Sequence, residues 1–422
     1  MQRIPLTPRP NWQHIVEQQG HTFHTLENGH PYWDESAAYE FTAAEIDTLE
    51  SAANELQGMC LAAAQHIIDH RRYADLSIPP AAIPVIEAAW NAEPPALYGR
   101  FDLIWSGAHS GDAPKLLEYN ADTPTSLLEA AVIQWNWLEE VGPNLPTHSF
   151  LPFTAPGPDQ FNSLHAKLIA KWRDLDPYLQ RPLYFSGVDT PGNPEDTLTL
   201  AYLEDTAQQG GLQTRRIPML EIGWNNARQC FVDNAENQIQ SLFKLYPWET
   251  LLHEDFGPHA LETYAGMSWI EPIWKLLLSN KGLLPILWEL YPNHPLLLES
   301  HFDSPHSMPA YVRKPLLSRE GEDVSITYAD GTTVENPGTY SGSDARFIFQ
   351  ALAPESTFTA IAVPPSTLTE DRLPSTTGSS SRPRHPVLGL WMVDQECCGL
   401  GIRESAGPIT DNLSSFIPHF FR

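Results

Sequence analysis

The stretch PKLLEYNADTP, residues 114–124, places polar side chains at alternate positions of a predicted strand. Glu118 and Asn120 stand two residues apart, and alternate side chains of an extended chain point to the same side. Arg100 and Asp102 have the same spacing further upstream. Carboxylate and amide oxygens are ligands for a Mg²⁺ ion that substrate phosphates also hold, and an arginine suits the anionic group that reacts. The alternative is a structural ion pair between Arg100 and Glu118 on a sheet face.

The elements that carry these residues predict how they meet. LYGRFDLIWSG, 97–107, and KLLEYNAD, 115–122, are apolar runs separated by a short polar loop, which is typical of a hairpin. Pairing of the two strands would bring Asp102, Glu118 and Asn120 to one spot. The row of polar residues would then end at a strand-to-helix junction, where a helix N-terminus favours anions.

Helical spacing of apolar residues predicts a packing helix over 42–72, opened by a capping box of Thr42 and Glu45. The same box at Ser126 predicts a helix over 127–141. We assign no chemistry to the first of these helices. Further apolar patterns predict a helix over 159–175 and strands at 183–187, 198–203, 311–314, 324–329, 388–393 and 400–403.

A second constellation lies in YVRKPLLSREGEDVSI, residues 311–326, which predicts a strand, a turn and a second strand. The order of Gly and Lys differs from that of a Walker A loop. Backbone N–H groups in the turn around Gly321, together with Lys314 and Arg319, could cover phosphate groups. The alternative is an ordinary hairpin with solvated charges.

Two more basic residues stand close to apolar segments. Lys281 lies in an apolar run, where a lysine either snorkels along apolar surface or reaches a phosphate. Arg403 follows the strand 400–402, with Glu404 and Asn412 as possible oxygen ligands nearby. We find no order of residues that supports a Ser/His/Asp triad.

Composition limits the classes of function. The chain has 422 residues, 42% of them hydrophobic, and its 39 prolines favour a loop-rich α/β or α+β protein over a helical bundle. Its 25 basic and 52 acidic residues give a net charge of −27, which argues against nucleic acid or an anionic membrane as partner. The acidic surface keeps the protein soluble or attracts a cationic substrate such as an amine.

Four cysteines fit neither a zinc pattern nor a disulfide scaffold. The N-terminal residues lack the apolar run of a signal peptide, and no stretch reaches the length of a membrane span. The expected location is the cytoplasm.

Several segments together resemble one known family. In this order they are RFD (100–102), LLEYNADTPTSLLEAA (116–131), KLYPWE (244–249), NKGLLPILWELYP (280–292), VRKPLLSREG (312–321) and GIRESAGPITDN (401–412). The ordered set resembles the synthetase part of the glutathionylspermidine synthase family, which belongs to the ATP-grasp ligases. The likeness extends from about residue 10 to the C-terminus.

The resemblance implies an ATP-grasp-like fold with a preceding α/β substrate-binding region. Family members use ATP and Mg²⁺, here two ions, to phosphorylate a carboxylate, and an amine then attacks the acyl phosphate. By analogy Asp102, Glu118 and Asn120 hold Mg²⁺. Arg100 faces the acyl phosphate and Arg403 the carboxylate substrate.

The resemblance also implies that Lys281 and Lys314 contact ATP phosphates and that Gln350 lies near the adenine hinge. Thr123 and Thr125 stand where the family has small hydroxyl residues. The acidic segment 194–205 stands where an amine or glutathione contact is expected. The thiol-amidase domain of bifunctional relatives has no counterpart in this sequence, so no hydrolytic half is expected.

From these observations we predict an ATP-dependent ligase of a small acid, such as a peptide, and an amine, such as a polyamine. The expected division is a mainly helical part, 1–95, an α/β region with the magnesium strands, 96–220, and an ATP-grasp region, 221–422. The last contains a polar Pro/Ser/Thr-rich segment, 364–386, that serves as a lid or is a flexible insertion. The alternatives are a catalytically silent nucleotide-binding or scaffold protein and a metal-free hydrolase. The oligomeric state stays open.

Overall fold

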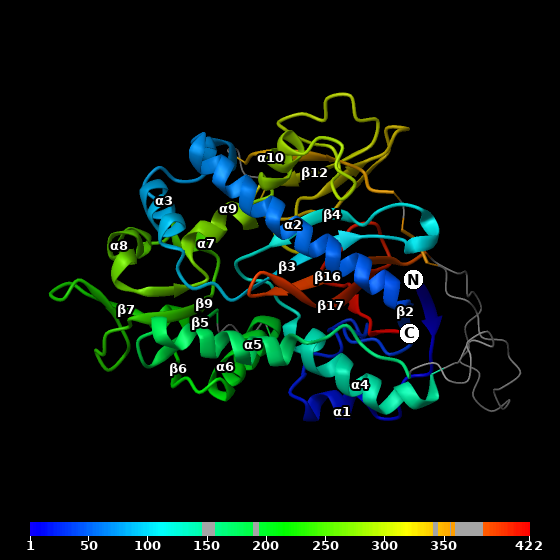
Figure 1. The fold of residues 1–422 in the computed structure, drawn as a ribbon, viewed down its shortest axis with the longest axis horizontal. Coiled ribbons are helices and arrows are strands. Elements are labelled where there is room, and N and C mark those ends of the chain that lie inside the picture. The colour runs from blue at the N-terminus through cyan, green and yellow to red at the C-terminus, as the bar shows by residue number, and fades with distance from the viewer. Residues whose placement is uncertain (146–156, 189–193, 341–344, 355, 359–382) are drawn as a thin grey trace, which may run out of the picture.

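An antiparallel five-stranded sheet lies at the centre of the molecule (Figure 1). The computed structural model describes residues 1–145, 157–188, 194–340, 345–354, 356–358 and 383–422. The central sheet joins strands from the first third of the chain to strands from its C-terminal end. Its spatial order is β18 (Ser415–Phe416), β17 (Glu396–Ser405), β16 (His385–Val393), β3 (Tyr98–Ile104) and β4 (Lys115–Asn120).

The long helix α2, Ala43–Asp69, crosses one face of this sheet and packs on β16 and β17 (Figure 1). Its apolar residues at helical spacing, among them Leu49, Leu56 and Ile67, are fully buried. The predicted capping box is confirmed, because the Thr42 hydroxyl accepts from the Glu45 backbone N–H and the Glu45 carboxylate accepts from the Thr42 N–H.

Replacing Thr42 with alanine should lower the free energy of unfolding by about 1 kcal/mol, because the first turn of α2 loses a side-chain acceptor. Urea denaturation of wild type and variant measures the difference. Thr42→Ser keeps the hydroxyl and is the matched control. Equal losses in the two variants would contradict the capping role.

A parallel four-stranded sheet with helices α5 (Leu164–Leu175) and α6 (Pro194–Gln209) forms the α/β part of the molecule. The strand predicted at 198–203 is wrong, because these residues lie within α6. Leu200 and Leu203 are buried at helical spacing, and α6 packs on α5 and β5. The strand order is β10 (Ser268–Ile270), β9 (Ser241–Leu245), β5 (Leu183–Gly187) and β6 (Thr214–Arg216).

A second antiparallel five-stranded sheet lies beside β4, where its Lys314 and Gln350 side chains donate to the backbone carbonyls of Leu117 and Leu116. The predicted strands at 311–314 and 324–329 are confirmed as a hairpin. The order is β11 (Ser300–Phe302), β15 (Phe347–Ala351), β12 (Tyr311–Pro315), β13 (Ser325–Thr327) and β14 (Thr333–Glu335).

The two ends of the chain lie close together, as Figure 1 shows, because both contribute to one three-stranded sheet. Its strands are β1 (Gln2–Pro5), β2 (Ala37–Phe41) and β19 (His419–Phe421), and a two-stranded sheet joins β7 (Gly223–Asn225) and β8 (Cys230–Val232). The remaining α-helices described are α1 (Trp12–Gln18), α3 (Ile83–Ala92), α4 (Gln134–Val141), α7 (Trp248–Leu251), α8 (Gly257–Thr263), α9 (Leu276–Ser279) and α10 (Leu283–Leu290).

The helix predicted over 127–141 is present, but it does not begin with a capping box. It opens with a π-helical turn, Glu129–Ile133, that continues into α4. Ser126 has a φ of 67° and its hydroxyl donates to Glu195 of α6. The capping-box prediction at Ser126 is therefore wrong, because a tertiary contact takes the hydroxyl.

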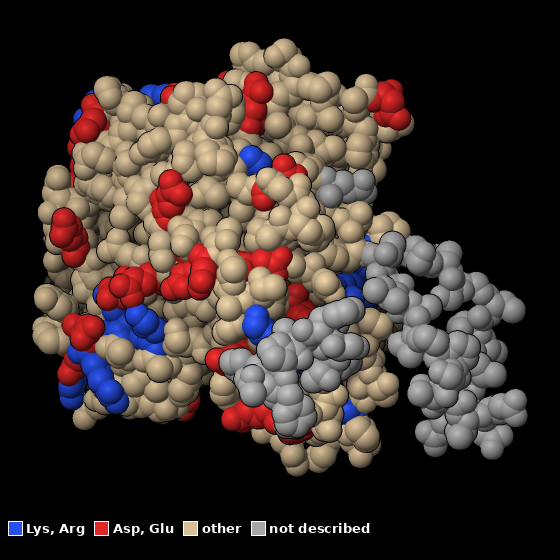
Figure 2. Space-filling view, turned by 45° about the vertical axis from the view of Figure 1, so that its right-hand side comes forward, with Lys and Arg blue, Asp and Glu red and all other residues tan. Residues whose placement is uncertain are grey.

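Acidic side chains are spread over the face in Figure 2, and basic ones are fewer and gather at its lower left. In the described part of the chain, no helix has both the length and the apolar character that a bilayer span needs. The division of the chain at residues 95 and 220 stays a prediction. The Pro/Ser/Thr-rich segment at 364–386 falls mainly outside the described residues, and its last residues, 385–386, open β16.

Candidate active site

The hairpin of β3 and β4 brings the predicted metal ligands together. Its register sets Arg100 opposite Asn120 and Asp102 opposite Glu118. The Asn120 amide donates to Asp102 Oδ2 at 3.1 Å and to Glu118 Oε1 at 3.3 Å. These three side chains therefore form one cluster, as the alternating pattern predicted.

Arg100 forms an ion pair within its own strand. Its Nε and Nη2 donate to the two carboxylate oxygens of Asp102, at 2.7 and 3.0 Å. The alternative of a pair between Arg100 and Glu118 is wrong, because alternate side chains of β3 bring Asp102 directly beside Arg100. Burial raises the pKa of Asp102 and the charge of Arg100 opposes that rise.

Glu118 lies between two lysines from distant segments. Lys281 Nζ is 3.2 Å from Glu118 Oε2, and its other contact is the Ser318 carbonyl at 2.5 Å. Burial would raise the pKa of Glu118, but the charges of Lys281 and Lys314 outweigh it and lower the pKa to about 2. Glu118 therefore stays ionised across the physiological range.

Lys314 points inward from β12. Burial lowers its pKa to about 8, and the charge of Glu118 opposes this shift. Its Nζ donates to Gln350 Oε1 at 2.7 Å and to the Leu117 carbonyl at 3.0 Å. The alternative of a hairpin with solvated charges is wrong for Lys314, which is 7% exposed.

Gln350 is buried on β15, next to Lys314. Its amide nitrogen donates to the Leu116 carbonyl at 3.0 Å, so both ends of the side chain are bonded within the protein. Gln350 thus orients Lys314. Its place at an adenine hinge stays a prediction.

The turn after β12 closes over the same cluster. Arg319 donates to Thr123 Oγ1 at 2.6 Å and to Glu249 Oε1 at 3.0 Å. Gly321 has a φ of 69°, and a Cβ atom there would lie 2.4 Å from the Thr410 carbonyl oxygen. The close approach of the two backbones therefore requires glycine at this position.

Arg403 extends from β17 towards the end of the central hairpin. Its guanidinium donates to the Ser414 carbonyl at 3.0 Å and lies 5.0 Å from the centre of the Tyr32 ring. Glu404 was expected nearby as an oxygen ligand, and this is wrong. Its carboxylate accepts two bonds from Arg3 on the other side of the strand.

These groups surround a single cavity of about 740 Å³. Five of the chain's 25 basic residues line it, although the chain as a whole is strongly acidic. All ten predicted site residues are among the lining residues: Arg100, Asp102, Glu118, Asn120, Lys281, Lys314, Arg319, Gly321, Gln350 and Arg403. The cavity wall near β12 and β15 is apolar, with Val312, Ile326 and Leu352 among its members.

Two acids at the start of α6 line the same cavity. Glu195 Oε1 accepts from the Ser126 hydroxyl at 2.8 Å. Burial, followed by the charge of Glu195, raises the pKa of Asp196 to about 7. The acidic content of 194–205 was the only sequence signal for these residues, and no spacing within it singled them out.

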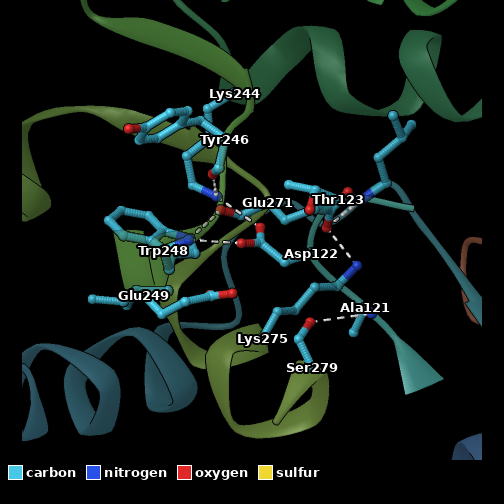
Figure 3. Close-up of polar contacts among 12 residues, drawn as sticks. Ala121, Asp122, Thr123, Lys244, Tyr246, Trp248, Glu249, Glu271, Lys275 and Ser279 are labelled. Carbon is cyan, nitrogen blue, oxygen red and sulfur yellow. Dashed lines mark hydrogen bonds and ion pairs between the residues drawn. The ribbon is translucent and has the colours of Figure 1, made fainter. Parts of the chain in front are cut away.

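The buried ion pair of Asp122 and Lys244 was missed by sequence reasoning. Figure 3 shows the Asp122 carboxylate between the Lys244 ammonium, at 2.7 Å, and the Trp248 backbone N–H, at 2.9 Å. Both charged side chains are fully buried. Lys244 also donates to the Tyr246 carbonyl at 2.9 Å. The pair ties the segment after β4, the strand that carries Glu118 and Asn120, to β9 and the segment that follows it.

Magnesium fits the donor set of the hairpin. The described residues include no group of three or more His, Cys, Asp or Glu side chains suited to hold a metal. Two carboxylates and an amide match an ion that completes its shell with water and phosphate oxygens. Asn120 presents its amide nitrogen to the carboxylates, so the amide would have to turn over to offer its oxygen.

Fold and site together define a class of protein. The chain belongs to the glutathionylspermidine synthase preATP-grasp family, which matches residues 3–422. This membership confirms the resemblance predicted from the ordered segments, and it places the chain among ligases that form C–N bonds.

Individual relatives are consistent with this class. A protein of Haemophilus influenzae, named as a candidate acid–amine ligase, is 36% identical over 427 residues, which cover 100% of both chains. Trypanothione synthetase of Crithidia fasciculata is 25% identical over 84% of this chain and 52% of its own. The bifunctional glutathionylspermidine synthetase/amidase of Escherichia coli is 24% identical over 68% of this chain and 47% of its own. The chain thus spans about half of the length of these two larger relatives.

The fold is also that of a solved structure. A glutathione synthetase-like effector from Globodera pallida, in its apo form, superposes with a TM-score of 0.53 at 10% identity, covering 99% of this chain and 100% of its own. At this identity the likeness concerns the fold alone. The predicted α/β, ATP-grasp-like fold is confirmed.

Proposed function

We propose that this chain is an ATP- and Mg²⁺-dependent carboxylate–amine ligase that forms an amide through an acyl phosphate. One observation carries the proposal: cationic side chains from four separate segments converge with Asp102, Glu118 and Asn120 on one cavity. Phosphoryl transfer requires positioning and charge neutralisation more than covalent chemistry by the protein. The converging side chains supply both the positioning and the charge neutralisation.

Each group has a defined role in this proposal. Lys281 and Lys314 bind the ATP phosphates, and the turn with Arg319 and Gly321 covers them. The apolar wall beside Gln350 binds the adenine base of ATP. Asp102, Glu118 and Asn120 would hold Mg²⁺, two ions in this proposal, and the charge of the metal would neutralise the triphosphate.

Arg403 binds the carboxylate of the acid substrate, and Arg100 faces the phosphoryl group that this carboxylate receives. Phosphorylation converts a poor acyl donor into one with a good leaving group. The attacking amine approaches from the end of the cavity where Glu195 and Asp196 lie, because carboxylates attract an ammonium group. Named relatives act on glutathione and spermidine, so we propose a peptidic acid and a polyamine as the substrate classes. The cytoplasm remains the expected location.

A phosphate-release assay tests this function. Purified protein, ATP and Mg²⁺ are combined with peptidic thiols or amino acids and with polyamines. We expect ADP and phosphate to form only when both acid and amine are present. The amounts of ADP and of phosphate should each equal the amount of amide formed. Hydroxylamine in place of the amine should give a hydroxamate, because it traps an acyl phosphate.

The assay also separates the alternatives. Tight ATP binding without turnover across the whole panel would favour a catalytically silent nucleotide-binding protein. Cleavage of a substrate without ATP would favour a hydrolase. Phosphate release that needs no acid would contradict an acyl phosphate.

A further inference from the structure

Arg403 is set apart from the other arginines on the cavity wall by its lack of an acidic partner. Arg100 pairs with Asp102, and Arg319 pairs with Glu249. In the part of the chain that the structure describes, no carboxylate lies within ion-pair distance of Arg403, and its buried Nε has no hydrogen-bond partner. A guanidinium in this state can bind an anion from outside the protein.

Hydrogen bonds and a ring contact hold this guanidinium in place. Its Nη2 donates to the carbonyls of Ser414 at 3.0 Å and Asp411 at 3.3 Å, and its Nη1 donates to Ser126 Oγ at 3.4 Å. Its central carbon lies over the ring of Tyr32, 5.0 Å from the ring centre. Two of the three hydrogen bonds are longer than the usual range for N–H···O. The ring therefore contributes much of what orients the guanidinium of Arg403.

Tyr32 lies between α1 and β2 and is fixed from several sides. Its carbonyl accepts from the Phe416 N–H at 2.6 Å, and Phe416 is the residue of β18 that stands opposite Arg403 in the sheet. Its hydroxyl lies 3.1 Å from Ser126 Oγ. The Tyr32 ring is 2% exposed and packs on the ring of Phe23, with 4.6 Å between their centres. The ring is thus a rigid support for Arg403.

The contact between Tyr32 and Arg403 is a cation–π interaction. Burial raises the pKa of Tyr32 well above its ordinary value, so the phenol stays neutral and the two side chains form no ion pair. A guanidinium is attracted to the negative face of an aromatic ring, and the attraction is stronger where water is excluded. The interaction holds the cation in place and leaves its charge free for an anion.

We propose that Tyr32 is a positioning residue of the acid site, which holds the Arg403 guanidinium in the orientation that binds the substrate carboxylate. The inference rests on the proposed function, in which Arg403 binds that carboxylate. A guanidinium that is fixed before binding loses less freedom when the carboxylate arrives, and this raises affinity. The segment between α1 and β2 then contributes to substrate binding as well as to the core.

The first test compares Tyr32→Leu with Tyr32→Phe in the phosphate-release assay, with the acid and amine of the panel that give turnover. Tyr32→Leu should raise the KM of the acid about tenfold, because Arg403 loses the cation–π contact. The kcat at saturating acid and the KM of ATP should stay within about twofold of wild type, since only binding of the acid is weakened. Tyr32→Phe keeps the ring and should keep the acid KM within about threefold of wild type.

Phe347→Leu is the matched control. It removes a ring whose centre lies 4.0 Å from the guanidinium carbon of Arg313, and neither of these residues lines the cavity. Its acid KM should equal that of wild type. An unchanged acid KM in Tyr32→Leu would overturn the inference. So would equal rises in Tyr32→Leu and Tyr32→Phe, or a loss in Tyr32→Leu that affects kcat and the KM of ATP as much as the acid KM.

Crystal structures of the variants without substrates give a readout that needs no turnover. The Arg403 guanidinium should keep its place in Tyr32→Phe and leave it, or spread over several positions, in Tyr32→Leu. A guanidinium of Arg403 that stays in place in Tyr32→Leu would contradict the positioning role.

If Tyr32→Leu fails to fold, the ring itself can be altered. Tyr32→Phe prepared with a trifluorinated phenylalanine keeps a ring of similar size, but its face is less negative. The acid KM should then be about threefold higher than in Tyr32→Phe with the ordinary ring, because the cation–π attraction is weaker. Equal KM values for the two rings would overturn the inference.

The outcomes separate this inference from the proposed function. Wild type inactive with every acid and amine would refute the function, and with it the acid site that Tyr32 serves. Wild type active, with an unchanged acid KM in Tyr32→Leu, would refute only the role of Tyr32.

Discussion

Replacing Glu118 with glutamine should lower kcat by at least about 10²–10³-fold, the range that follows the loss of one preorganised electrostatic group. Glu118 is the carboxylate on which the hairpin cluster and two lysines converge. The variant keeps the shape of the side chain but removes its charge. Metal affinity should fall, and the two lysines should repel each other without their common partner.

The measurement is the phosphate-release assay with the best acid and amine, together with titration of Mg²⁺. Glu118→Gln should require more Mg²⁺ and still fail to reach wild-type kcat at saturation. Glu139→Gln is the control, because it removes an exposed charge that lines no part of the cavity. Wild-type kcat in Glu118→Gln, with a normal Mg²⁺ requirement, would remove Glu118 from the metal site.

The second large effect concerns stability. Asp122→Asn should lower the free energy of unfolding by about 3–5 kcal/mol, because it leaves the buried Lys244 ammonium without its partner. Burial raises the pKa of Asp122 and lowers that of Lys244. Each charge is therefore tolerated only beside the other. Asparagine keeps the shape of the side chain and an acceptor for the Trp248 N–H. The loss in unfolding free energy therefore measures the effect of removing the charge.

The double variant Asp122→Asn/Lys244→Met is the decisive comparison. It removes both charges, and it should be more stable than Asp122→Asn alone, since replacing a buried pair as a unit is far less costly than breaking it. Urea midpoints of the three proteins measure this. A double variant at least as unstable as the sum of its single variants would contradict a coupled ion pair.

The same pair has a consequence for activity. Asp122 follows Asn120 by two residues, and its partner segment continues into Pro247, which lines the cavity, and into Glu249. Breaking the pair should thus loosen both the hairpin of β3 and β4 and the segment around Glu249, which Arg319 contacts. The double variant should recover stability without full activity, because methionine and asparagine do not reproduce the bonds that fix these backbones.

Some of this site was predictable from local spacing alone. Side chains two apart on a strand share a face, and a short loop between apolar strands makes a hairpin. The cluster of Asp102, Glu118 and Asn120 therefore followed from residues that are close in sequence. The helix α2 followed for a similar reason, since its capping box and its apolar spacing are both local.

The predictions of secondary structure were wrong where a local pattern fitted two structures or where a contact with a distant residue determined the local structure. LTLAYL, 198–203, has apolar residues that suit both a strand and a helix, and packing of α6 on α5 selects the helix. Ser126 and Glu129 have the spacing of a capping box. In the structure, however, the Ser126 hydroxyl donates to Glu195 and Ser126 has a positive φ.

The sequence by itself determined the strand-borne cluster of Asp102, Glu118 and Asn120, the long helix and the family, because each rests on short-range spacing or on an ordered set of segments. Only the tertiary structure decided which distant charges meet: Lys281 with Glu118, and Lys244 with Asp122. The physical reason is that burial sets the strength and the cost of a charge interaction. Burial belongs to the folded chain and has no signature in the spacing of these residues.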